Sequence, residues 1–157
     1  MSISTLPTSD NQIAENTVIE QALNILESRI KRPNNFITSV ADTKSFLKLK
    51  LEHLEHEVFS VLLLNNKHAV IHYSEMFRGT IDAANVHPRE VVKEVLAFNA
   101  SAVVFAHNHP SGVAEPSRAD MDITNKLKDA LTLIDVRVLD HIVVGEKVVS
   151  FAERGLL

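Results

Sequence analysis

The stretch AHNHPSGVAEPSRAD, residues 106–120, decides how this sequence is interpreted. It is preceded by a short apolar run, ASAVVFA, which is typical of a central strand covered on both faces. Side chains two residues apart in a strand point to the same side, so His107 and His109 present both imidazoles to one volume. Pro110 favours an extended conformation at His109 and ends the strand. The sequence therefore predicts two histidine side chains converging at the end of a strand.

Ser117 and Asp120, which follow the loop, allow two interpretations. The structural one is that they nearly form a capping box at the start of the next helix. The chemical one adds Asp120 to His107 and His109, because two neutral imidazoles and one carboxylate hold a tetrahedral Zn²⁺ with an open fourth position, as in catalytic zinc sites. The two roles are compatible, since an N-cap serine can hold the helix end while its neighbour coordinates.

Composition limits the classes of protein that need to be considered. The chain has 157 residues, 45% hydrophobic and 23% charged, which fits one globular domain. It has no cysteine, so disulfides, thiolate zinc fingers and iron–sulfur ligation are excluded, and a metal must bind to His, Asp or Glu. The net charge of −4, with scattered Lys and Arg, disfavours nucleic acid as a partner.

The N-terminal sequence and the apolar runs bear on location. The first residues, MSISTLPTSDNQIAENTV, lack the basic and apolar segments of a secretory signal. The longest apolar runs are far shorter than the roughly 20 residues that cross a bilayer. We expect a cytoplasmic protein without a membrane span.

Periodicity predicts a mixed β-sheet flanked by helices, an α/β (α+β layered) fold. The expected elements are an amphipathic helix over 18–30, a helix from Thr38 or Ser39 to about His56, a hairpin over 57–77, a helix from Pro88, a strand up to His109, a helix after Ser117, and a strand pair over 140–151. In the second helix Val40, Phe46, Leu47, Leu51 and Leu54 are expected on the inner side, and in the helix from Pro88 the inner residues are Val91, Val92, Val95 and Leu96. Asn-Asn in the hairpin turn NNKH is expected to adopt positive φ.

The spacing H-x-H, seven residues, S, two residues, D resembles the JAMM motif of JAB/MPN-type zinc metallopeptidases. The segments HPREVVKEVL, AHNHPSG, EPSRAD, LDHIVVG and SFAERG resemble the RadC family in particular. The likeness covers residues 36–157, which leaves 1–35 as an N-terminal extension with one helix. It implies a JAB/MPN-like domain with the layered, cytidine-deaminase-like architecture.

The resemblance also implies site residues and a reaction. It implies Zn²⁺ on His107, His109 and Asp120, and a glutamate upstream as acid/base. Glu57, where a helix passes into the first core strand, is the candidate, and Glu75 in YSEMF is the rival. The implied reaction is hydrolysis of peptide or isopeptide amides: Glu57 takes a proton from the zinc-activated water, and Ser117 stabilises the oxyanion.

Other functions remain open at this point. The same fold can be a catalytically silent metal-binding or protein-interaction module, or a DNA-repair-associated accessory protein. The expected partner is a peptide or protein substrate, and the outer strand of the hairpin, residues 69–74, is open to strand addition or to a homodimer contact. Arg89 is a weaker candidate for substrate contact. Asp140 and His141 are expected to support the site or pack a helix rather than to ligate a metal.

Overall fold

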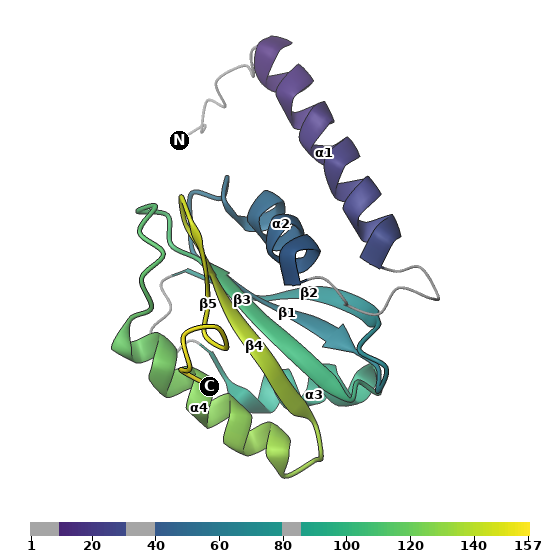
Figure 1. Ribbon diagram of the computed structural model, residues 1–157, viewed down its shortest axis with the longest axis vertical. Helices are drawn as coiled ribbons and strands as arrows, with labels where there is room; N and C mark the ends of the chain where they lie inside the picture. Colours follow the sequence, from purple (N-terminus) through teal and green to yellow (C-terminus); the bar gives the residue numbers. More distant parts are fainter. Residues whose placement is uncertain (1–9, 31–39, 80–85) are drawn as a thin grey trace, which may run out of the picture.

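The computed structural model of the protein describes residues 10–30, 40–79 and 86–157. In these residues a five-stranded sheet in the order β2-β1-β3-β4-β5 has helices on both faces (Figure 1). The elements are α1 (Asp10–Ile30), α2 (Val40–Leu51), β1 (Val58–Leu64), β2 (Val70–Arg78), α3 (Pro88–Ala97), β3 (Ala102–Asn108), α4 (Arg118–Thr132), β4 (Arg137–Val144) and β5 (Val148–Ser150). The layered α/β fold with a mixed sheet is confirmed.

The sheet is mixed because two kinds of connection build it. Strands β1 and β2 form an antiparallel hairpin, and β4 pairs with β5 in the same way. Strand β3 is antiparallel to β1 but parallel to β4, and α4 makes the crossover between these parallel neighbours. Strand β3 is therefore paired along both edges, as its continuous apolar sequence predicts.

Each face of the sheet packs against its own helices. Phe59, Phe105 and their neighbours two residues apart join α3 and α4 in one core, which includes Val91 and Leu127. The alternate residues of the strands face the other way and pack on α2, where Phe46 and Leu47 are buried. The period of two in the strands thus produces two separate cores.

The second helix is shorter than expected. It ends at Leu51 rather than near His56, and residues 52–57 follow an irregular path to β1. Phe46, Leu47 and Leu51 are buried as predicted, whereas Val40 is 51% exposed. The expected caps, Thr38 and Ser39, lie outside the described residues.

Two further details differ from expectation. In the hairpin turn the positive φ is at His68 (φ 60°) rather than at the asparagines, because Asn65 uses its side-chain oxygen to accept the backbone N–H groups of Lys67 and Ala69. In α3, Pro88 begins the helix as predicted, but Leu96 is 59% exposed and does not belong to the inner face.

Helix α1 packs on the domain through part of its surface. Leu23 and Leu26 contact the α2 core, and Lys50 of α2 lies 3.5 Å from a carboxylate oxygen of Glu27. Val18 and Ile25 are exposed, so the apolar residues of α1 are not gathered on one buried face. Division of the chain after residue 35 stays a prediction. Within the described ranges, every helix is too short or too polar to cross a membrane.

The contrast between Leu127 and Leu96 gives a test of the core. Leu127→Ala empties space in a fully buried position of α4, and we expect it to lower the free energy of unfolding by about 2–5 kcal/mol. Leu96→Ala is the matched control on α3 and should change it by less than about 0.5 kcal/mol. Urea unfolding of both variants measures the difference, and similar losses would contradict the assignment of the inner faces.

Candidate metal centre

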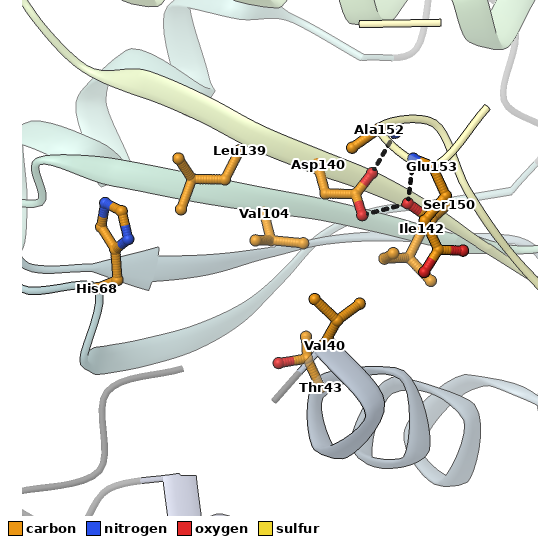
Figure 2. A pocket seen from close by; sticks show the side chains of 10 residues that line it. All are labelled: Val40, Thr43, His68, Val104, Leu139, Asp140, Ile142, Ser150, Ala152 and Glu153. Atoms are coloured by element: carbon orange, nitrogen blue, oxygen red, sulfur yellow. Dashed lines mark hydrogen bonds between the residues drawn. The ribbon is translucent and has the colours of Figure 1, made fainter. Parts of the chain in front are cut away.

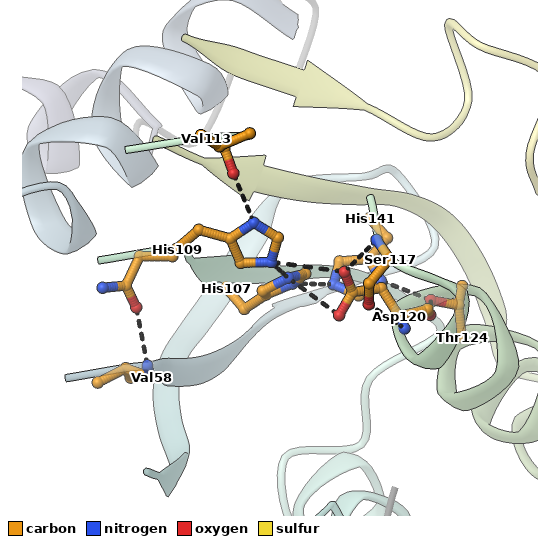
Figure 3. A network of polar contacts seen from close by, with 9 residues as sticks. Val58, His107, His109, Val113, Ser117, Asp120, Thr124 and His141 are labelled. Carbon is orange, nitrogen blue, oxygen red and sulfur yellow. Dashed lines mark hydrogen bonds and ion pairs between the residues drawn. The ribbon is translucent and has the colours of Figure 1, made fainter. Parts of the chain in front are cut away.

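Two histidines and one aspartate meet where β3 ends and α4 begins (Figure 3). His107 lies in β3 and is fully buried, His109 follows the strand directly, and Asp120 lies in the first turn of α4. The Nε2 atoms of the two histidines are 3.0 Å apart. His107 Nε2 is 3.2 Å from Asp120 Oδ1, and His109 Nε2 is 3.5 Å from Asp120 Oδ2. The three side chains thus form a candidate metal-binding group.

The spacing of these atoms fits a tetrahedral ion. Zinc bonds to His nitrogen and carboxylate oxygen are about 2.0–2.1 Å long, which places two ligand atoms of a tetrahedron about 3.3 Å apart. The three separations of 3.0, 3.2 and 3.5 Å bracket that value. The donor set of two imidazoles and a carboxylate suits a divalent transition metal.

The loop after β3 orients His109. Its Nδ1 lies 2.7 Å from the carbonyl oxygen of Val113. A carbonyl only accepts hydrogen bonds, so Nδ1 carries a proton and donates, and Nε2 faces Asp120, to which it donates when the ring is protonated and beside which it offers a lone pair when the ring is neutral. The backbone N–H of His109 donates to Val144 O of β4, and Glu146 N–H donates to Gly112 O, which ties the loop to the β4–β5 turn. A Cβ at Gly145 would lie 2.4 Å from Gly112 O, so this approach requires glycine.

Asp120 has two roles, as the sequence suggested. Ser117 is the N-cap of α4: its Oγ accepts the N–H of Asp120 at 3.1 Å, and Asp120 Oδ2 accepts the N–H of Ser117 at 2.7 Å. This capping box fixes the rotamer of Asp120 while Oδ1 faces His107. The hydroxyl of Ser117 lies beside the cluster and uses a lone pair, not its proton, for the cap.

The charges of the cluster change the pKa values of two members. Burial by itself raises the pKa of the Asp120 carboxyl, but hydrogen bonds from His107 and His109 outweigh burial and hold that pKa well below its ordinary range. The pKa of His109 is raised above 6.5, chiefly by its hydrogen bond to Asp120 and against the effect of burial. The charge of Glu57 adds to this increase.

Asn108 joins the cluster to the first strand. Its side chain points away from the histidines, and its Oδ1 accepts the N–H of Val58 at 2.8 Å. Its Nδ2 donates to the carbonyl of His56 at 3.0 Å. The residues around Glu57 are therefore held against the end of β3 by a buried amide, whereas the periodicity predicts a helix as far as about His56.

The two glutamate candidates lie on different faces of the sheet. Phe59 is paired with His107, and Glu57 precedes Phe59 by two residues, on the side where its charge acts on His109. Glu75 is paired with Ser60 instead, and accepts a hydrogen bond from Tyr73, which packs on the α2 face. Of the two, Glu57 is the glutamate that lies on the face of the cluster.

The sequence predicts part of the support of this cluster, because His141 is expected to support the site or pack a helix rather than to bind a metal. His141 of β4 is fully buried, and its Nε2 lies 2.8 Å from His107 Nδ1. Thr124 of α4 contacts the other ring nitrogen at 2.6 Å, although nothing had singled it out. Its position seven residues after Ser117, on the buried side of α4, was the available signal. Arg89, the candidate for substrate contact, is exposed and pairs with Glu90 at 4.0 Å.

Asp140 points to the opposite face from His141. There it lines a mainly apolar pocket with Val40, Val104 and Leu139 (Figure 2). Its carboxylate accepts the hydroxyl of Ser150 at 2.5 Å and the N–H of Ala152 at 2.9 Å. The pocket and the metal-binding group are thus separated by the sheet, and Asp140 holds β4 and β5 together rather than contributing a ligand.

The fold and the cluster together define a JAB-type α/β domain with a candidate metal centre. A family model described as "RadC-like JAB domain" matches residues 37–156, and the chain belongs to this family. A UPF0758 protein of Vibrio cholerae is 57% identical over 143 residues, covering 91% of this chain and 90% of the relative. A UPF0758 protein of Thioalkalivibrio sulfidiphilus is 56% identical over 140 residues, covering 89% of this chain, and one of Marinobacter nauticus is 54% identical. The chain spans 62% of the length of each of the latter two.

The raised pKa of His109 predicts a pH dependence for the metal-free protein. A histidine whose pKa is raised on folding adds stability that is present below 6.5 and is lost as pH rises through the folded-state value. The difference in free energy of unfolding between wild type and His109→Gln should therefore decrease as pH increases above 6.5. Urea unfolding in the presence of chelator measures this difference, and a gap that widens with pH would contradict the His109–Asp120 ion pair.

Proposed function

We propose that the protein is a zinc-dependent hydrolase of the JAMM metallopeptidase type that cleaves peptide or isopeptide amide bonds. The observation that carries the proposal is the convergence of three ligand atoms at tetrahedral spacing on the same sheet face as Glu57. His107, His109 and Asp120 would hold the ion. Membership of the JAB family supports the same class of chemistry without naming a substrate.

The proposed mechanism divides the work between the ion and the side chains. When bound, zinc would lower the pKa of a coordinated water and polarise a substrate carbonyl. Glu57 receives the proton of the attacking water and returns it to the leaving amine nitrogen. The Ser117 hydroxyl keeps its proton while capping α4, so it can donate to the oxygen on which negative charge develops. The negative charge of Glu57 also adds to the negative potential at the site, which favours binding of a cation.

The metal site is tested first. Native mass spectrometry of untagged protein supplied with zinc should find one ion per chain in wild type and none in His109→Ala. His53→Ala removes an exposed histidine from the segment before β1 and should keep the ion. Wild-type protein that binds no zinc would refute the hydrolase mechanism.

Turnover is tested with the two glutamates. Internally quenched peptide libraries and lysine isopeptide conjugates serve as probes, and we expect Glu57→Gln to slow cleavage by about 10²–10⁴-fold with zinc content unchanged. Glu75→Gln, on the other face, is the matched control and should retain the wild-type rate. Stoichiometric zinc with no cleavage of any probe by wild type would favour a silent metal-binding module over a hydrolase.

A further inference from the structure

His141 is a buried histidine that is surrounded mainly by aromatic rings. Strand pairing sets it beside Phe105, two residues before His107. The rings of Phe59 and Phe105 approach it edge-on, and Phe151 stacks on it at 4.7 Å. His141 is fully buried, and its ring nitrogens contact a hydroxyl and another imidazole rather than a carboxylate, so these surroundings favour the neutral ring. The neutral ring has one N–H donor and one acceptor nitrogen.

The Thr124 hydroxyl determines which nitrogen of His141 is the donor. Thr124 Oγ1 lies 2.5 Å from the carbonyl oxygen of Asp120, one turn earlier in α4, and 2.6 Å from His141 Nδ1. A carbonyl only accepts hydrogen bonds, so the single hydroxyl proton lies between Thr124 and Asp120. The contact with His141 then requires that Nδ1 donates to the hydroxyl oxygen.

The proton position on His141 in turn determines the proton position on His107. With its proton on Nδ1, His141 has its acceptor lone pair on Nε2, which faces His107 Nδ1 at 2.8 Å. His107 therefore donates from Nδ1, which leaves Nε2 as the atom that faces the volume shared with His109 and Asp120 and whose lone pair a bound metal would take (Figure 3). The direction of each hydrogen bond in the series from Thr124 through His141 to His107 therefore follows from the backbone carbonyl of Asp120.

We propose that His141, held by Thr124, is a positioning residue that fixes the tautomer and ring orientation of His107 for metal binding. The inference rests on the proposed function only in taking His107 as a ligand. Asp140 supports the arrangement, because its Oδ1 accepts the backbone N–H of His141 at 2.7 Å while Oδ2 is held by Ser150 (Figure 2). The partner of a ligating histidine usually controls metal affinity by about 10–100-fold.

The first test measures zinc affinity by competition with a chromophoric chelator. His141→Phe keeps an aromatic ring among the phenylalanines but removes the acceptor, and its affinity should fall by about 10–100-fold. His141→Gln can present an amide oxygen near the position of Nε2 and should recover most of the loss. Recovery would distinguish positioning from packing, because glutamine fills the aromatic surrounding less well than phenylalanine. Wild-type affinity in His141→Phe would overturn the proposal.

Thr124→Val provides a nearly isosteric second variant, in case His141→Phe does not fold. It removes the hydroxyl that determines the direction of the hydrogen bonds through His141 to His107. Zinc affinity should therefore fall, but by less than in His141→Phe. Thr132→Val is the matched control. Like Thr124, Thr132 donates its hydroxyl proton to the backbone carbonyl four residues earlier in α4, that of Lys128 at 2.7 Å, but its side chain is exposed. Equal affinities of the two threonine variants would contradict the role of Thr124.

The second test does not depend on metal binding. Long-range ¹H–¹⁵N spectra of the metal-free protein report which imidazole nitrogens carry a proton, and we expect a proton on Nδ1 of both His107 and His141. A His107 ring without a proton on Nδ1 would overturn the proposal even if zinc binds. Conversely, if the expected protons are found but the protein binds no zinc, the hydrogen bonds from Thr124 to His107 stand and only the proposed hydrolase is refuted.

Discussion

The hydrogen-bonded position of β3 between β1 and β4 is the constraint on which the site depends. Every residue of this strand is buried, including His107 and Asn108 near its end. Burying such polar groups is unfavourable unless they find partners, so each neighbouring element contributes one. Strand β1 offers the Val58 N–H to Asn108, β4 offers His141 to His107, and α4 offers Asp120. Among the described residues, every buried side-chain nitrogen and oxygen has a hydrogen-bond partner.

The cluster is organised before any ion binds. The capping box holds Asp120, the Val113 carbonyl holds His109, and the strand holds His107, so the ligand atoms need little movement to reach tetrahedral spacing. An ion bound here would replace protons and attractive contacts that already draw the three side chains together. Such preorganisation reduces the conformational entropy lost on binding.

Local sequence patterns predicted the helices and strands, and the features that they did not predict depend on contacts between residues far apart in the sequence. The period of two in β3 and the Ser117–Asp120 spacing are local, so they indicated the convergence of the ligands and the capped helix. The early end of α2 at Leu51 was not predictable, because residues 52–57 are held by Asn108, which lies about fifty residues later. The contact of His141 with His107 depends on the β3–β4 register, which shifts between Val103 and Val104. Side chains that meet through such a register leave no periodic signal in the sequence.

The three candidate ligands, together with His141 and Thr124, come from residues 102–144, the β3–α4–β4 unit. Glu57 comes from a separate segment that reaches the site through the pairing of β1 with β3 and the amide of Asn108. The residues proposed for ion binding and the residue proposed for proton transfer are therefore encoded in different parts of the gene. A lineage can lose the glutamate by one codon change and keep an intact centre for the ion. Within such a family, descendants that differ in chemistry are expected to share the same folded scaffold.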